Sequence, residues 1–206
     1  MLFLRTANAG GLIVSKDVNV LIDGVCGELF PYIKTPENKK KEFLLNPPQI
    51  VAYTHNHIDH YDEDFAECYK KITGRKILGV ESIEELNCDG VTVSAIKTKH
   101  IGKENPAHFS FLIKGEKTVL FTGDASPLQW KNIGSLGHLD AVIVPYAYAN
   151  TKPAWEITKG FGATKVILLH MPERNHDEYG LYDMVNSVVG DDKTLVMPGI
   201  GQEITL

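Results

Sequence analysis

The stretch VAYTHNHIDHYDEDF, residues 51–65, decides which fold we expect for this chain. Within six positions it places His55, His57, Asp59 and His60, directly after an apolar run. Two interpretations compete. The segment is either a metal-binding loop, or the acidic N-terminus of a helix in which the histidines are incidental. The spacing inside the loop and the rest of the chain decide between them.

The spacing within the loop suits one metal ion, and further residues of the loop can bind a second. His55 and His57 are two positions apart, so in extended backbone their side chains leave the same face and can hold one cation. Asp59 and His60 follow on the turn into the next helix, where they can address a neighbouring position. One short loop can therefore supply ligands to two metal ions.

Residues that can bind a metal recur at the ends of predicted strands along the chain. They are Asp23, His55, His100, Asp124 and His170. Strand ends gathered on one edge of a sandwich bring such side chains into a single cleft on a rigid scaffold. Signals for a helix start are present too, but they do not explain this recurrence. The pattern therefore predicts a metal centre followed by a helix.

The order of apolar runs predicts an α/β fold. We expect strands at 2–5, 11–14, 19–23, 50–53, 76–80, 91–98, 109–114, 117–122, 141–145 and 165–169, and a final strand and turn within 194–206. We expect helices at 62–71, 152–161 and 177–189, and a loop at 24–48. Two successive blocks of strands with interspersed helices indicate an αββα sandwich, with two mixed β-sheets flanked by helices. With 206 residues and no linker or repeat, residues 1–206 are expected to form a single domain.

The candidate ligands divide into two sets. His55, His57 and His100 can fill one site, and Asp59, His60 and His170 the other, with Asp124 able to bridge them. Two divalent ions roughly 3.5–4 Å apart would hold a hydroxide and polarise a scissile bond. Because all ligand atoms are nitrogen or oxygen, zinc is favoured, and manganese, iron and nickel also fit.

These residues carry a family resemblance. The string THNHIDH resembles the H-x-H-x-D-H signature of the metallo-β-lactamase-fold hydrolases. In order along the chain, Asp23, His100, Asp124 in FTGDAS and His170 in VILLHMP resemble the further motif residues of that family. The segment 139–173 is similar to the ascorbate-6-phosphate lactonase-like branch. The resemblance implies a metal-dependent hydrolase that cleaves an ester-type bond of a small molecule, whether lactone, phosphodiester or thioester.

Three assignments within this framework remain predictions. The loop KHIGKENPAHFSF offers His100 and His108 as the third-motif ligand; we favour His100 because it ends a strand, whereas His108 begins the next one. His108 then either faces the substrate or sits in the sheet. Asp59 is the candidate catalytic residue, which holds a metal and accepts or relays the proton of the attacking water. Asp23 is expected to accept a hydrogen bond from a ligand imidazole and fix its orientation.

An oxidoreductase is the alternative function. Some proteins of this fold resemble di-iron or sulfur-oxidising iron enzymes. The di-iron members typically carry a glutamate where this chain has His57, and they dock a flavin domain, which favours hydrolysis here. A mono-iron enzyme similar to sulfur dioxygenases stays open.

Composition and charge limit the classes of binding partner that we expect. The formal net charge of -5, with acids and bases mixed along the chain, disfavours nucleic acid. No apolar run approaches the roughly 20 residues that a membrane span needs, so no membrane partner is expected. Three scattered cysteines without a C-x-x-C pair fit a reducing cytoplasm. Specificity is expected from loops 24–48, 101–107 and 146–153. The candidate contacts for an anionic or sugar-like substrate are Lys103, Tyr146, Tyr148 and Arg174, with an ordinary surface position as the alternative for each. Oligomeric state is not readable.

Overall fold

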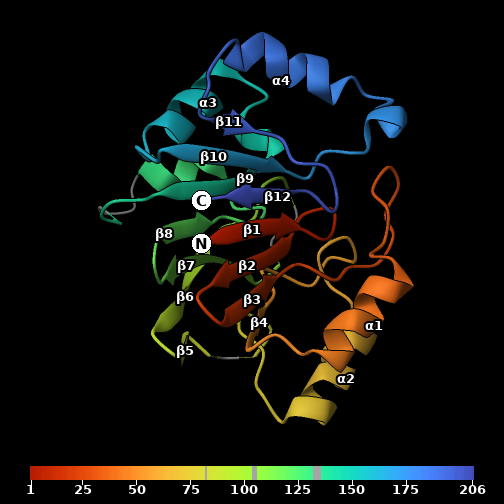
Figure 1. Cartoon of the computed structure of the whole chain (residues 1–206). Coiled ribbons are helices and arrows are strands. Elements are labelled where there is room, and N and C mark those ends of the chain that lie inside the picture. Colours follow the sequence, from red (N-terminus) through yellow and green to blue (C-terminus); the bar gives the residue numbers. More distant parts are fainter. Residues whose placement is uncertain (82, 104–105, 132–135) are drawn as a thin grey trace.

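The computed structural model describes residues 1–81, 83–103, 106–131 and 136–206, and these form two stacked mixed sheets with helices outside them (Figure 1). In spatial order, the first sheet contains β12 (Glu203–Thr205), β1 (Leu2–Arg5), β2 (Gly11–Ser15), β3 (Val18–Ile22) and β4 (Ile50–Ala52). The second contains β11 (Leu195–Val196), β10 (Lys165–Leu169), β9 (Ala141–Pro145), β8 (Thr118–Phe121), β7 (His108–Lys114), β6 (Val91–Thr98) and β5 (Glu85–Cys88).

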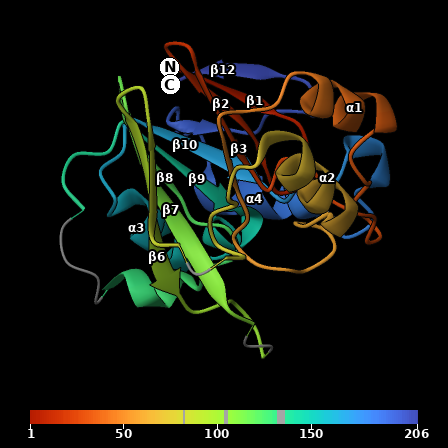
Figure 2. The same ribbon diagram turned by 90° about the horizontal axis from the view of Figure 1, so that it is seen from below.

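Both sheets are mixed, as predicted. In the first sheet only β3 and β4 run parallel, while β12, β1, β2 and β3 pair antiparallel. In the second, β8 to β11 are parallel and β5 to β8 are antiparallel. The two ends of the chain meet because β1 pairs with β12 (Figure 2).

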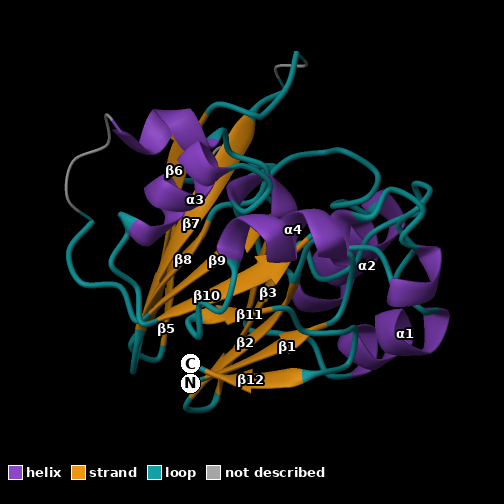
Figure 3. Ribbon diagram, turned by 90° about the horizontal axis from the view of Figure 1, so that it is seen from above, coloured by secondary structure: helices purple, strands orange, loops and turns teal. Residues whose placement is uncertain are grey.

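Three apolar clusters correspond to the three interfaces of an αββα sandwich. Alternate side chains of each strand point to opposite faces, so Ile143 of β9 packs between the sheets, whereas Val142 and Val144 pack outward under helices. The outer face of the second sheet is covered by α3 (Lys152–Lys159) and α4 (Leu181–Val189). The outer face of the first is covered by α1 (Glu37–Leu45) and α2 (Glu63–Thr73) (Figure 3). The predicted fold class is confirmed.

Local capping explains where the helices begin and end. The Asp62 side chain accepts a hydrogen bond from the Phe65 amide, and Gly74 ends α2 in the left-handed conformation, so the predicted helix at 62–71 is confirmed. The predicted helix at 177–189 begins later, at Leu181. Asp177 is not part of α4, because its carboxylate accepts hydrogen bonds from the Leu181 and Tyr182 amides at 2.8 and 3.0 Å.

Two expectations about elements are wrong, and one strand was not expected. The predicted loop 24–48 contains α1, which was missed because its sequence ENKKKEFLL has almost no apolar periodicity and buries only Phe43. The segment 76–80 is not a strand: Leu78 forms only isolated bridges, and Gly79 has a φ of 92°. The edge strand β5 was not predicted, because its sequence ELNC is mostly polar.

Short 3-10 helices occupy Pro127–Lys131, Tyr146–Tyr148 and Arg174–His176. Within the described ranges, no helix is long and apolar enough to cross a membrane.

Candidate metal centre

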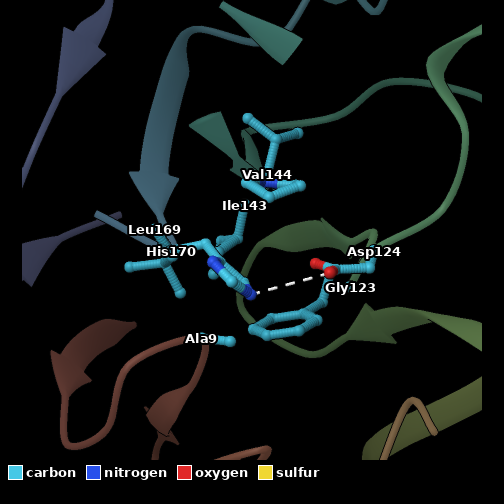
Figure 4. A pocket seen from close by; sticks show the side chains of 9 residues that line it. Ala9, Gly123, Asp124, Ile143, Val144, Leu169 and His170 are labelled. Carbon is cyan, nitrogen blue, oxygen red and sulfur yellow. Dashed lines mark ion pairs between the residues drawn. The ribbon is translucent and has the colours of Figure 1, made fainter. Parts of the chain in front are cut away.

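The loops that follow β3, β4, β6, β8 and β10 converge at one end of the sandwich. They bring Asp23, the histidine loop, His100, Asp124 and His170 together. Figure 4 shows His170, at the end of β10, facing Asp124 in the loop after β8, with 3.6 Å between Nε2 and Oδ2. These two residues line a cavity of about 10 Å³ under the centre, which Ala9, Phe121 and Ile143 help to close.

All seven predicted ligands fall into three groups whose ligand atoms lie within 4.8 Å of one another. The groups are His55, His57 and His100; His55, His60 and Asp124; and Asp59, His60 and His170. Because His55 and His60 each belong to two groups, the three groups form one continuous centre rather than separate sites.

The first group, called the triple-histidine cluster below, consists of His55, His57 and His100. His55 Nε2 lies 3.0 Å from His57 Nδ1. The ring centroids of His55 and His57 each lie 4.8 Å from that of His100. One ring nitrogen from each of the three imidazoles lies within 4.8 Å of the other two, so the three can share one metal ion.

Carboxylates dominate the other side of the centre. Asp59 Oδ2 lies 3.0 Å from His170 Nε2 and 3.9 Å from His60 Nε2. Asp124 Oδ2 lies 3.6 Å from both of these nitrogens and 3.9 Å from His100 Nε2. Asp124 thus stands between the triple-histidine cluster and the Asp59 side, where a bridging carboxylate would have to stand.

The unpaired atoms of the centre fit a metal. Buried polar atoms are normally hydrogen-bonded, because an unpaired one has lost its water without compensation. Here His60 Nε2, both ring nitrogens of His100, His170 Nδ1 and Asp124 Oδ1 are buried without a hydrogen-bond partner. A cluster of orphaned nitrogen and oxygen atoms is the donor set that zinc and similar divalent ions take.

The electrostatics favour neutral imidazoles on one side and a cation on the other. Burial lowers the pKa of His55 and of His100, which leaves their nitrogen lone pairs free for a metal. Burial also opposes a charge on His60, but Asp124 and Asp23 outweigh it and raise the pKa of His60 well above its usual value. The carboxylates therefore favour positive charge at this position, whether a proton or a metal ion carries it.

A buried hydrogen-bond network orients the ligand rings. Asp23 accepts hydrogen bonds from the Thr54 amide at 2.8 Å, the Thr54 hydroxyl at 2.6 Å and His60 Nδ1 at 2.9 Å. The predicted hydrogen bond between Asp23 and a histidine of the loop is therefore present, with His60 as the histidine. Because the Thr54 hydroxyl donates to Asp23, its contact of 3.0 Å with His55 Nδ1 makes that nitrogen the donor. In the neutral form of both rings, Nε2 then carries the lone pair.

Two residues of the β1–β2 hairpin support the carboxylate side and were not predicted. Asn8 Nδ2 donates to Asp59 Oδ2 at 3.4 Å, and the Asn8 carbonyl accepts from the His170 amide at 3.2 Å. The buried Arg5 guanidinium donates to four backbone carbonyls, at distances of 2.7 to 3.1 Å: Ala7, Asn8, Met171 and Pro198. The sequence RTANAGG, residues 5–11, gives no local pattern that predicts these contacts, because they depend on which loops the sheets bring together.

His100 and His108 take different positions relative to the candidate ligand groups. His100 shares a ligand group with His55 and His57, whereas His108 belongs to none of the groups. His108 is buried beside the centre with its Nδ1 at 2.6 Å from Thr98 Oγ1, and burial lowers its pKa to about 3. The geometry favours His100 as the ligand.

The two tyrosines suggested as substrate contacts differ. Tyr148 is wholly buried; its hydroxyl accepts from Trp130 Nε1 at 2.6 Å and donates to the Ala125 carbonyl at 2.9 Å, so it is a core residue. The Tyr146 ring lies 6.1 Å from that of His170 and stays beside the centre. Residues 104 and 105 of the 101–107 loop lie outside the described residues.

Comparisons with known proteins agree with this geometry. A sequence model of the metallo-beta-lactamase superfamily matches residues 8–61, which contain Asp23 and the histidine loop. The isothiocyanate hydrolase from Delia radicum gut bacteria has a TM-score of 0.67 at 15% identity, over 100% of this chain and 99% of that one. A possible metal-dependent hydrolase from Veillonella parvula has a TM-score of 0.70 at 16% identity, over the same shares.

A third similar structure is CmlA, a diiron beta-hydroxylase from Streptomyces venezuelae, with a TM-score of 0.65 at 17% identity over 100% of this chain and 54% of that one. No curated protein sequence matches the chain. The family model and the shared fold support the metallo-beta-lactamase superfamily, whose members use divalent metal ions.

Proposed function

We propose that the chain is a metal-dependent hydrolase that holds two divalent ions and cleaves an ester-type bond in a small molecule. The observation that carries this proposal is the set of three interlocking ligand groups, with Asp124 between the triple-histidine cluster and Asp59. Zinc is the favoured metal because the donors are imidazole and carboxylate; manganese, iron or nickel would meet the same donors. Two neighbours of the same fold carry hydrolase names, which supports hydrolysis.

In the proposed arrangement, the triple-histidine cluster holds one ion, and Asp59, His60 and His170 hold the other, with Asp124 shared. When bound, the ions would supply Lewis acidity and lower the pKa of a bound water molecule.

The chain's own residues do the positioning. Asp23 and Thr54 fix the rings of His60 and His55, so that each presents Nε2 to the centre. Asp59 Oδ2 is held between His170 Nε2 and the Asn8 amide. We assign Asp59 the second role of taking up the proton from the attacking water, because its carboxylate is the buried acid closest to His170.

The decisive experiment combines metal analysis with a substrate panel. The purified protein is reconstituted with Zn²⁺, Mn²⁺, Fe²⁺ or Ni²⁺, the bound metal is counted, and each form is tested on a lactone, a phosphodiester, a thioester and an isothiocyanate. We expect two ions per chain and hydrolysis of one substrate class, abolished by chelation. Fewer than two tightly bound ions of every metal would contradict the binuclear centre.

An iron-dependent oxidoreductase is the second candidate. The specific observation in its favour is the fold shared with the diiron beta-hydroxylase CmlA. The presence of His57 rather than a glutamate in the histidine loop favours hydrolysis. Oxygen uptake by the iron-loaded protein with a thiol or persulfide substrate separates the two, since a hydrolase consumes no oxygen.

The remaining assignments belong to the same proposal. We treat residues 1–206 as one domain that acts on a small molecule in the cytoplasm, within the lactonase-like branch. The similarity of segment 139–173 to that branch and the three unpaired cysteines support these assignments.

A further inference from the structure

His108 is a sixth histidine, at the edge of the proposed metal centre. It is the first residue of β7, and it is only 1% exposed. Its ring centroid lies 5.1 Å from that of His55 and 5.6 Å from that of His100. His108 Nε2 has no hydrogen-bond partner. Buried ring nitrogens are normally hydrogen-bonded, so Nε2 of His108, beside two candidate metal-binding residues, is suited to bind a partner.

A chain of hydroxyl groups determines which nitrogen of His108 carries the proton. Ser110 Oγ donates to the Thr122 carbonyl at 2.7 Å, which uses its only proton. Thr98 Oγ1 lies 3.2 Å from Ser110 Oγ, so that contact is a hydrogen bond only if Thr98 donates. Thr98 Oγ1 must then accept from His108 Nδ1, at 2.6 Å. All three contacts are satisfied only in this arrangement.

The consequence is a defined acceptor. With the proton on Nδ1, His108 Nε2 carries a lone pair and no hydrogen. It therefore complements an O–H or N–H group and repels a bare anionic oxygen. It lies outside the three ligand groups of the centre, which leaves it for the bound molecule rather than for an ion.

We propose that His108 is a substrate-binding residue whose Nε2 accepts a hydrogen bond from an O–H or N–H group of the molecule held at the triple-histidine cluster. The site therefore selects ligands that carry such a donor beside the group that meets the metal. This inference rests on the proposed metal centre and adds a feature of its substrate.

The test compares two ligands that differ in this donor. Acetohydroxamate keeps an N–H group when it binds a metal, whereas azide has no donor. Binding of each to the Co²⁺-loaded protein is followed through the visible absorption of the metal, and bound metal is counted in parallel.

Two substitutions at one position separate the ring nitrogens. His108→Asn keeps a polar atom near Nδ1 for Thr98 but has nothing at the Nε2 position, whereas His108→Gln places its amide near Nε2. We expect His108→Asn to weaken acetohydroxamate binding by about tenfold, the effect of one hydrogen bond, with azide binding within about twofold of wild type. His108→Gln should recover part of the loss, and both variants should retain two metal ions. His138→Asn, at an exposed histidine, is the control.

Equal weakening of acetohydroxamate and azide binding, or no weakening of either, would overturn the proposal. Loss of a metal ion from His108→Asn would also overturn it, because His108 would then be a metal-binding residue.

If His108→Asn does not fold, Thr98→Val takes its place, because it removes the hydroxyl that fixes the tautomer of His108. Acetohydroxamate binding should then fall and azide binding should not. Unchanged binding of both would overturn the inference. Failure of the metal centre itself would show in the wild-type metal count, before any variant is measured.

Discussion

The carboxylate of Asp23 and the imidazole of His60 form a wholly buried hydrogen bond, with 2.9 Å between Oδ2 and Nδ1. Asp23 lies at the end of β3 in the left-handed region, with a φ of 46°, so the backbone turns sharply to present this carboxylate. The bond holds the proton of His60 on Nδ1 and leaves Nε2 facing Asp59 and Asp124.

Asp23→Asn should weaken metal binding at the His60 side of the centre. The asparagine amide has one oxygen that accepts and one nitrogen that donates. Either Thr54 or His60 would therefore face an N–H group instead of an acceptor. We expect the affinity for one of two ions to fall about 10- to 100-fold, the usual effect of losing a carboxylate behind a ligand histidine. Chelator competition measures it. Asp140→Asn is the matched control, because Asp140 also accepts from a backbone amide, that of Thr118, but far from the centre. Equal affinities in wild type and Asp23→Asn would contradict this role.

Asp124→Ala should reduce the number of tightly bound ions from two to one or none, because Asp124 is the carboxylate within 3.9 Å of both sides of the centre. Native mass spectrometry or metal analysis after buffer exchange gives the count. His138→Ala, at an exposed histidine, should keep both ions. A variant with two tight ions and full activity would show that Asp124 is not the bridge.

Arg5→Met should destabilise the fold strongly. It removes a buried cation and leaves four backbone carbonyls, from three segments of the chain, without their hydrogen-bond donor. An unsatisfied buried group costs about 1–3 kcal/mol, so we expect a loss of about 3 kcal/mol or more in the free energy of unfolding. Urea unfolding measures the loss.

Arg75→Met is the control for Arg5. Arg75 is exposed and donates one bond, to the Pro48 carbonyl, so its loss should cost about 1 kcal/mol or less. Similar losses in the two variants would mean that the Arg5 network adds nothing. The Arg5 variant should also bind metal more weakly, since Asn8 and Met171 adjoin the Asp59 side of the centre.

Gly123→Ala should disturb the centre through Thr54. Gly123 has a φ of 52°, and an added Cβ would lie 2.5 Å from Thr54 Cγ2 and 2.8 Å from Thr54 Oγ1. Left-handed backbone alone costs an alanine roughly 1–2 kcal/mol, and the collision adds about 1–3 kcal/mol. Thermal unfolding and metal affinity should both fall.

Gly74→Ala isolates the backbone cost. Gly74 has a φ of 66° and nothing within 4 Å of an added Cβ, so only the strain of the left-handed conformation applies. We expect a smaller loss of stability there and unchanged metal affinity. If the two alanine variants behave alike, Thr54 has room to move and the proposed disturbance of the centre through Thr54 is wrong.

Local pattern in the sequence was enough to predict most of the fold and to identify the candidate ligands that the structure brings together. Strands at 2–5, 91–98, 141–145 and 165–169 lie at their predicted bounds, because apolar runs and turns are encoded within a few neighbouring residues. The histidine loop, with the residues that end β8 and β10, indicated which side chains meet. By contrast α1, with a charged sequence and little apolar face, gave no such pattern.

The choice between His100 and His108, the contacts of Asn8 and Arg5, and the hydroxyl chain behind His108 were decided only by tertiary structure. Each joins segments far apart in the chain, and its geometry depends on sheet register and loop packing. Spacing along one strand determines which face a residue takes, but not which side chain from another loop arrives opposite it. The sequence by itself therefore indicated the candidate ligands, and packing between the two sheets determined how their side chains are held.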